Sequence, residues 1–408
     1  MKRTGKFVKI LSLVLCAAML MLALASCGKG DNVLTFTADG KEYTLTESEL
    51  DFMMMYRKYQ LFYANSYPSS YDAFLWQDAE TDSSITQVIV DTAKTVLVEK
   101  YLMEKFGLEL DEKEVKELKD KYKASVKQWG GQGGFKARFG WTADQMMQYD
   151  LAIKNNTMIR DYLYNTETGV EKVTDEELDA YYNEKYKQYQ LIMITTTQDV
   201  SKNDEGKKEY LVYDKDGKEV TVTDISEENL KANEYSLAYS YKYVDLEEGS
   251  ERKEEKTALV DEILAELKEG ADFKELALKY SDEFLTEYFE DGYILEGDLI
   301  NDEDAIEAIN KLEVGDYTET AISIESGKYY YIVKRVALEE KAYTHAYEGA
   351  ENTEYADLFE DFGSTVADSK YEKFLEEYIN AVVENKEVLE TYSMATTKLS
   401  PMIAKMIG

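Results

Sequence analysis

The sequence predicts a protein of the α+β class, with helical segments on both sides of a central section that is rich in strands. Apolar side chains recur at helical spacing over much of residues 46–189 and again after residue 340. Between these parts, aromatic and apolar side chains alternate with a period of two, most clearly over 329–334, which is typical of a strand. A solute-binding protein of two α/β lobes would instead alternate strands and helices throughout.

The first 26 residues have the pattern of a secretory signal. Four basic residues precede an apolar run from Ile10 to Leu24, which is short for a membrane-spanning helix. The following Leu24-Ala25-Ser26-Cys27 matches a lipoprotein cleavage site, so Cys27 is the expected lipid-bearing first residue of the mature chain. The alternative is an ordinary secretory signal in which Cys27 is incidental.

Composition limits the chemistry of the mature chain. Its two Cys are Cys16, inside the signal, and Cys27, so neither a disulfide nor a Cys-ligated metal site is expected. GxSxG and HExxH motifs are absent, and the single His, His345, excludes metal sites that need several. The 82 Asp and Glu against 47 Lys and Arg give a net charge of −35, which argues against nucleic acid as a partner. A self-repelling, solvated surface explains this acidity more simply than a specific basic partner, and we expect no cofactor and no metal.

The N-terminal part is predicted to be a hairpin followed by helices. Val33–Thr46 alternates on both sides of Asp39-Gly40, a turn pair. Caps and apolar stripes then predict five helices: from Thr46 to about Leu61, from Ser83 to Gly107, over 109–129, from Thr142 to Leu163 and from Thr174 to Tyr186. The glycines of 130–134 lack the GK[ST] ending and the preceding strand of a phosphate-binding loop, so a turn between helices is expected there.

The central part begins with a strand at Gln190–Thr195, followed by a polar segment. Within that segment, Glu209–Thr223 is predicted to be a hairpin that turns at Asp216-Gly217. The sequence Asp214-Lys215-Asp216-Gly217 partly matches the start of a calcium-binding loop, but the later ligands of an EF-hand are missing. Tyr235–Tyr243 alternates as a further strand, whose tyrosine face either packs on helices or binds an extended peptide.

The pattern of Thr257–Val336 predicts two amphipathic helices, a third short helix and a closing strand. This stretch contains the short sequences GADF, ALKYS, LEVGD and YIVK. This stretch resembles the parvulin-type (PpiC) peptidyl-prolyl isomerase domain. Together with the lipoprotein cleavage site at Leu24–Cys27 and the helix predicted over Val173–Tyr189, this stretch makes the chain similar to the PrsA-type foldase lipoproteins, which are relatives of the SurA chaperones. The resemblance implies a signal peptide at 1–26, a helical domain at 27–189, a parvulin-like domain at 190–340 with an insertion near 196–246, and a C-terminal segment at 341–408 that packs on the helical domain.

Two positions decide the chemistry that this resemblance implies. Parvulins carry one His on the first strand and one on the last, behind a prolyl ring whose amide the pocket twists over a barrier of about 18–20 kcal/mol. Here the first position falls within Leu191–Met193, or near Tyr241 if the tyrosine-rich strand is the first one. The last-strand motif contains Tyr331 in place of His, and His345 lies beyond the domain, where a surface position is expected.

The other pocket positions implied by the resemblance are altered as well. The aromatic position corresponds to Ile306, the methionine position to Ile300, and the acidic or thiol position to Asp282 or Glu283. The expected pocket is therefore degenerate and has no catalytic residue; its positions are Ile192, Asp282, Ile306 and Tyr331.

The resemblance implies a membrane-anchored folding factor on the extracytoplasmic face of a bacterium, in a Gram-positive cell. Its partners would be unfolded or newly exported polypeptides and, through the N-terminal lipid, the membrane. We expect weak or no prolyl isomerase activity. The alternatives are an active isomerase, because twisting an amide needs pocket shape more than acid–base chemistry, and a surface lipoprotein that only binds.

Overall fold

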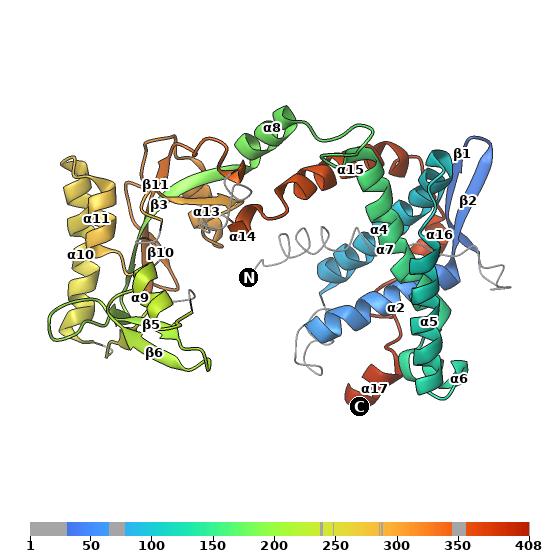
Figure 1. Cartoon of the computed structure of the whole chain (residues 1–408), viewed down its shortest axis with the longest axis horizontal. Coiled ribbons are helices and arrows are strands. Elements are labelled where there is room, and N and C mark those ends of the chain that lie inside the picture. Colours follow the sequence, from blue (N-terminus) through green and yellow to red (C-terminus); the bar gives the residue numbers. More distant parts are fainter. Residues whose placement is uncertain are drawn as a thin grey trace. The chain divides into compact units, whose positions relative to one another are not determined.

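A computed structural model of the chain describes residues 31–64, 78–236, 240–247, 249–284, 286, 289–344 and 356–407. The described residues form two compact units (Figure 1). The helical unit contains the described residues up to Asp175 together with those from Asp361 onward, and the sheet unit is Glu176–Glu360. The α+β class predicted from the sequence is confirmed.

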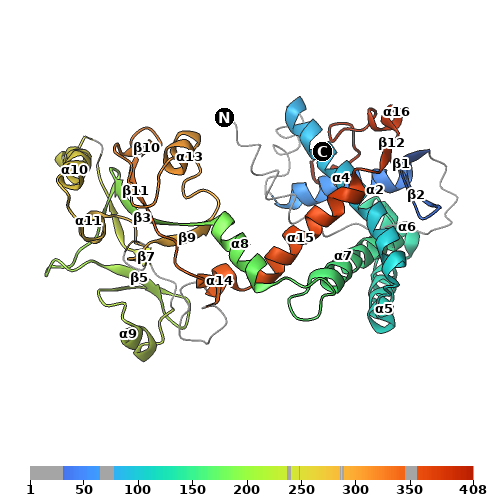
Figure 2. The same ribbon diagram turned by 90° about the horizontal axis from the view of Figure 1, so that it is seen from above.

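The helical unit begins with the predicted hairpin. Strands β1 (Asn32–Ala38) and β2 (Lys41–Thr46) pair in antiparallel fashion, and β12 (Val383–Glu384) adds to the free edge of β1 (Figure 2). The helices of this unit are α2 (Glu47–Ala64), α4 (Ala79–Phe106), α5 (Glu112–Gln128), α6 (Gln132–Phe139), α7 (Ala143–Tyr164), α15 (Phe362–Ile379), α16 (Lys386–Leu389) and α17 (Pro401–Ile407).

Capping residues and glycines in the sequence determine where most of these helices begin and end. The Thr46 amide and hydroxyl both donate to Glu49, and Thr142 forms a complete capping box with Gln145. Helix α4 begins earlier than predicted because the Asp78 carboxylate caps it, and it ends at Gly107 in the left-handed conformation. A turn between helices is present at the predicted place, with Gly130 and Gly131 at positive φ, but it is shorter than 130–134, since helix α6 begins at Gln132 and contains the last two of those glycines.

The C-terminal segment completes the core of the helical unit. Helix α15 packs against α4 and α7, where the Arg160 guanidinium of α7 contacts Asp368 at 2.7 Å. Buried side chains of α15, among them Val366 and Leu375, share this core with apolar residues of α4. Residues more than 200 positions apart in sequence therefore form one hydrophobic core.

The sheet unit is built on four antiparallel strands in the order β10 (Ile322–Ile324), β11 (Tyr329–Val336), β3 (Tyr186–Thr195) and β9 (Tyr293–Glu296). Helices α10 (Glu251–Lys268) and α11 (Phe273–Tyr280) pack on one face of this sheet, and α13 (Glu303–Asn310) packs on the other (Figure 1). Helix α8 (Asp175–Lys185), η1 (Ala342–Thr344) and α14 (Ala356–Phe359) complete the unit, and Tyr182 of α8 stacks among the rings of Tyr186, Tyr343 and Phe359.

The segment between β3 and α10 folds as an insertion with its own small sheets. Strand β4 (Gln198–Val200) pairs with β8 (Tyr243–Asp245), and β5 (Tyr210–Tyr213) lies between β6 (Glu219–Val222) and β7 (Ser240–Tyr241). Helix α9 (Glu227–Ala232) follows β6. The predicted Asp216-Gly217 hairpin is confirmed as β5–β6. Of the predicted tyrosine-rich strand at 235–243, residues 237–239 lie outside the described residues, and the described part contains β7 and the start of β8.

None of the helices among the described residues is long and apolar enough to cross a membrane.

Candidate functional site

The first and last strands of the parvulin-like fold lie side by side at the centre of the sheet. Strand β11 pairs along its whole length with Gln188–Thr195 of β3, with Tyr331 directly opposite Met193 and Ile332 opposite Ile192. The strand that lies beside β11 is therefore β3, whereas Tyr241 lies on β7, which pairs with β5 in a separate small sheet. Side chains on adjacent positions of a strand point to opposite faces, so this register assigns each residue to a face.

Ile192 and Tyr331 lie on different faces of the sheet. Ile192 is fully buried beside Ile332 in the core formed with α10 and α11. Tyr331 is half-buried on the opposite face, which we call the tyrosine face: it carries Tyr331, Met193, Leu191 and Tyr293, and α13 covers part of it. On this face, Met193 is the β3 side chain that stands beside Tyr331.

The segment Ser281–Glu283, which follows α11, is fixed to β3 by a set of short hydrogen bonds. The Asp282 amide donates to the Met193 carbonyl at 2.7 Å, and the Met193 amide donates to the Ser281 hydroxyl at 3.1 Å. The Thr195 amide donates to the Asp282 carboxylate at 3.0 Å. Because these bonds connect consecutive residues, the position of Glu283 beside Met193 is set by backbone geometry.

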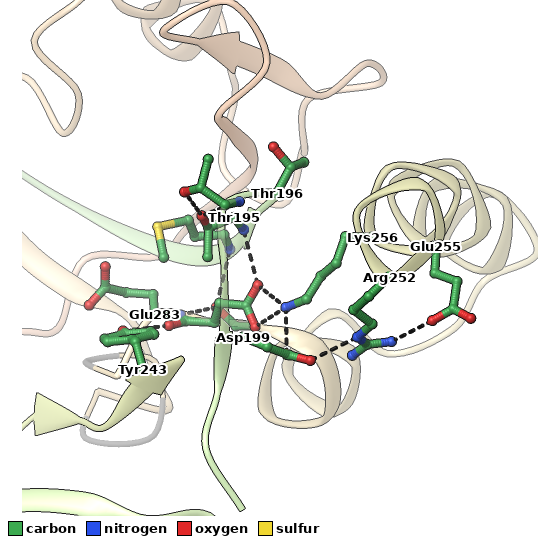
Figure 3. Close-up of polar contacts among 12 residues, drawn as sticks. Thr195, Thr196, Asp199, Tyr243, Arg252, Glu255, Lys256 and Glu283 are labelled. Atoms are coloured by element: carbon green, nitrogen blue, oxygen red, sulfur yellow. Dashed lines mark hydrogen bonds and ion pairs between the residues drawn. The ribbon is translucent and has the colours of Figure 1, made fainter. Parts of the chain in front are cut away.

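Asp282 itself is buried in an ion-pair network, of which Figure 3 labels Lys256, Asp199 and Arg252. The Lys256 ammonium of α10 lies 2.7 Å from both carboxylate oxygens of Asp282 and 2.9 Å from Asp199 of β4. Arg252 also donates to Asp199, at 2.7 Å. Burial raises the pKa of the Asp282 carboxyl, and Lys256 acts in the opposite direction. Burial also acts to raise the pKa of Asp199, but the bonds from Arg252 and Lys256 outweigh it, so that this pKa is lowered.

This network connects three parts of the unit rather than facing a ligand. Lys256 is 2% exposed and Asp282 is 4% exposed, so neither group is accessible to a peptide. Lys256 connects helix α10 to the insertion through Asp199 and to the segment after α11 through Asp282. We therefore regard it as the support that positions Glu283.

Glu283 is the carboxylate that belongs to the tyrosine face. In Figure 3 its side chain points away from Lys256 and lies on the side of Tyr243. Burial raises the pKa values of the tyrosines around it, and the negative charge of Glu283 is the next cause for each of them: Tyr243, Tyr293 and Tyr331. Glu283 and these three rings are half-buried, so they form a surface that solvent reaches.

The insertion supplies one wall of this surface. The Tyr243 hydroxyl of β8 donates to the Asp282 carbonyl at 2.8 Å, next to Glu283. Behind it, Tyr241, Val200 and Phe284 form a small core, in which the Tyr241 and Phe284 rings meet edge to face at 5.4 Å. The insertion is thus packed against the site, and Tyr243 is one of its side chains.

A small cavity lies next to the tyrosine face. It is lined by side chains of β3, α11 and β9, among them Leu191, Ala277 and Tyr293, and by Phe289. Its volume is about 10 Å³, which is about the space of one water molecule. A peptide would therefore bind on the face itself and not in this cavity.

The structure brings together some of the residues predicted from the sequence. Asp282 and Tyr331 both lie near Met193, but the Asp282 carboxylate is turned into the Lys256 network, and Glu283 is the acid beside the tyrosines. Ile192 lies on the helix-covered face, as described above. Ile306 is half-buried on α13, and Ile300 packs against the core of the tyrosine face. Cys27 and His345 lie outside the described residues.

Sequence reasoning missed Lys256, which looks like one more charge on an acidic helix. It also chose Ile192 over Met193. The period of two shows only that Ile192 and Met193 point to opposite faces of the sheet, and the pairing of β3 with β11 decides that Met193 is the one beside Tyr331.

Among the residues that the structure describes, no group of three or more His, Cys, Asp or Glu side chains is placed to hold a metal ion.

Comparison with known proteins agrees with the sheet geometry. Residues 218–334 match the family model of the PPIC-type PPIASE domain. The chain contains a PPIC-type domain. The match begins inside the insertion and leaves out β3, although β3 is the strand that pairs with β11 in the PPIC-type domain. In sequence, residues 196–250 separate β3 from α10.

Several solved structures of foldases are similar to the chain at low identity. PrsA from Streptococcus pneumoniae is 16% identical, with 86% of this chain and 91% of that chain covered and a TM-score of 0.22. PrsA from Bacillus subtilis is 16% identical, with 76% and 86% covered and a TM-score of 0.21. PrsA from Bacillus cereus is 16% identical, with 93% and 99% covered and a TM-score of 0.26. With such TM-scores, the assignment of the PPIC-type domain rests on the family model and the sheet. A search of curated proteins gives no significant match.

Proposed function

We propose that the protein is a folding factor for exported polypeptides, which holds unfolded segments against the tyrosine face of its PPIC-type domain and has weak or no prolyl isomerase activity. The observation that carries the proposal is the pair of residues facing each other across β3 and β11. Where the parvulin resemblance leads us to expect two histidines, this pair is Met193 and Tyr331. The domain has the four-stranded sheet, but the side chains at its centre are a thioether and a phenol in place of two imidazoles.

The tyrosine face has properties that suit loose binding of varied segments. Half-buried tyrosines offer large apolar ring surfaces together with hydroxyl groups, and few rotatable bonds must be fixed when a segment binds. Tyr329 and Tyr331 lie side by side on β11, with ring centroids 6.4 Å apart. Neighbouring rings of this kind give an extended chain several equivalent places to bind, which supports holding rather than selective recognition.

An aggregation assay tests the holding activity. The mature chain is mixed at equal molar amount with a chemically unfolded client, and light scattering is followed during dilution. We expect suppression by the wild type, weaker suppression by Tyr331→Ser, and wild-type behaviour of Tyr213→Ser, a control tyrosine on β5 that is 43% exposed. Absence of suppression by the wild type contradicts the proposal.

A protease-coupled assay on a prolyl peptide tests the isomerase alternative. We expect the background rate for the wild type, because no imidazole lies on either central strand. If the wild type raises the rate well above background, the active-isomerase alternative replaces the weak or absent activity proposed here. The double variant Met193→His with Tyr331→His asks whether the pocket still accepts proline: a gain in rate only when both are present would point to a retained pocket.

Membrane anchoring through Cys27 is part of the proposal and rests on the signal pattern alone. It places the protein on the extracytoplasmic face of a bacterial membrane, in a Gram-positive cell, with the lipid as its contact. In cells, the wild type is expected in the detergent phase and Cys27→Ala in the aqueous phase after phase separation. A wild type that stays in the aqueous phase contradicts the anchor without affecting the folding activity. A chain that is anchored but inactive in both assays above would instead be a surface lipoprotein that only binds.

A further inference from the structure

The two units of the chain differ greatly in charge. Glu176–Glu360 contains 49 Asp and Glu against 20 Lys and Arg, a net charge of −29, while the whole chain has −35. Almost all of the excess negative charge is therefore on the sheet unit that carries the tyrosine face. A field of this sign concentrates cationic segments at the surface and repels anionic ones.

Glu283 is a carboxylate of this unit whose backbone position is fixed by hydrogen bonds. Its backbone is held through Ser281 and Asp282 to Met193, the residue opposite Tyr331. On the other side, the Tyr243 hydroxyl bonds the carbonyl of Asp282, one residue before it. A carboxylate in a rigid setting is thus flanked by two tyrosine rings that belong to different elements, β11 and the insertion.

A tyrosine of this sheet already accepts a cation from within the chain. The Lys328 ammonium lies over the Tyr329 ring at 4.8 Å from its centroid, and it also contacts Glu325 at 3.3 Å. Tyr329 is the neighbour of Tyr331 on the same face of β11. The combination of a ring face and a carboxylate is therefore one that this strand uses to hold an ammonium group.

We propose that Glu283, together with Tyr243 and Tyr331, binds a Lys or Arg side chain of the polypeptide segment that lies on the tyrosine face. This inference rests on the proposed function and names its substrate class: unfolded segments with a basic residue among apolar and aromatic ones. The carboxylate supplies a charge-assisted hydrogen bond, and the rings supply cation–π contacts. Because the site is half-buried, water screens these electrostatic interactions less than it does at the open surface. The raised pKa values of the tyrosines keep their hydroxyls neutral, so these rings add no charge of their own.

The test compares two unstructured peptides that differ at one position. One has Arg and the other Gln in the middle of the same apolar and aromatic sequence, and both are titrated into the mature chain by calorimetry at low and high salt. We expect the Arg peptide to bind about 10-fold more tightly at low salt, and the difference to shrink at high salt. In Glu283→Gln, the Arg peptide is expected to bind only as well as the Gln peptide, whose affinity stays unchanged.

Glu307→Gln is the matched control, because it removes one charge from an exposed position of α13 in the same unit. It is expected to keep the preference for Arg. Equal affinities of both peptides for the wild type, or equal loss of preference in Glu283→Gln and Glu307→Gln, would overturn the site and leave the proposed function standing. If neither peptide binds and aggregation is not suppressed, the proposed function itself fails, and the site with it.

Discussion

Each unit of the chain contains a carboxyl group that is less than 5% exposed, and the two units stabilise this group differently. In the helical unit, Glu99 of α4 is 1% exposed, and its hydrogen-bond donors among the described residues are neutral: the Asn156 amide of α7 and the Tyr371 hydroxyl of α15. In the sheet unit, Asp282 is 4% exposed and is bound by the buried ammonium of Lys256. Burial raises the pKa of Glu99 to about 8, so that its carboxyl group is largely protonated at neutral pH.

The difference follows from the surroundings of each group. Glu99 lies where three helices meet, among buried apolar residues of α4 such as Val96 and Leu102, and a second charge there would itself need solvation. Asp282 lies between a helix, a strand and the insertion, where a long Lys side chain reaches both Asp282 and Asp199. The helical unit therefore contains a buried, hydrogen-bonded neutral acid at Glu99, and the sheet unit contains a buried ion pair at Asp282.

The largest effect is expected from Lys256→Met, which leaves the Asp282 carboxylate buried without its cation. Removing one partner of a buried pair costs about 3–5 kcal/mol, and we expect that loss in the urea-induced unfolding of the sheet unit. Lys274→Met is the control, because Lys274 pairs with Glu290 and with the exposed Asp291, and it should cost well under 1 kcal/mol by the usual value for surface pairs. Equal effects of the two variants would contradict the structural role of Lys256.

The second prediction concerns the pH dependence of the helical unit. The folded-state pKa of Glu99, about 8, lies above its ordinary value of 4.5, so the folded state binds more protons between these two pH values. The free energy of unfolding contributed by this group therefore falls as pH rises from about 4.5 to about 8, and it stays level above that range.

Glu99→Gln should remove this fall, because an amide stays neutral and still accepts a hydrogen bond. At pH 8.5 we expect the variant to be more stable than the wild type by about 4 kcal/mol, because each pKa unit between 4.5 and about 8 corresponds to about 1.4 kcal/mol, and at pH 5 we expect a difference below about 1 kcal/mol. Thermal unfolding followed by circular dichroism at both pH values measures the difference. Parallel pH profiles for variant and wild type would show that Glu99 is already charged in the folded protein.

A smaller effect is expected from Tyr371→Phe, which removes one of the two donors to Glu99. Loss of one buried hydrogen bond to a carboxyl group costs about 1–2 kcal/mol, and it should appear in urea unfolding at neutral pH. Tyr378→Phe, on the same helix, is the control: its hydroxyl accepts a bond from Lys105 at an exposed position and should matter less. A cost at position 378 that equals the cost at position 371 would contradict the proposed role of the Glu99 contact.

The smallest effect is expected from Lys311→Ala in α13. Its partner Glu307 is four residues earlier and both side chains are about 70% exposed, 69% and 71%. Surface pairs of this kind contribute about 0.3–0.5 kcal/mol, which is near the detection limit of urea unfolding. A loss above 1 kcal/mol would show that the pair supports the packing of α13 on the tyrosine face.

Local chemistry in the sequence determined where many elements begin and end. The capping pairs Thr46 with Glu49 and Thr142 with Gln145 predict their helices correctly, because a cap depends only on residues three positions apart. The Asp216-Gly217 pair likewise predicts the β5–β6 hairpin, since its turn needs a positive φ that Gly217 provides. The α+β class follows from the periods of the apolar residues alone.

Only the tertiary structure decided which residues meet at the candidate site. Register and face depend on the pairing of β3 with β11, strands about 140 positions apart in sequence, and a shift of one residue exchanges Ile192 for Met193 beside Tyr331. Likewise, sequence left Asp282 and Glu283 equivalent, and the buried Lys256 separates them: it takes Asp282 into the interior and leaves Glu283 on the tyrosine face. Burial is a property of the packed chain, so charge in an acidic sequence cannot show which carboxylate is structural and which faces a ligand.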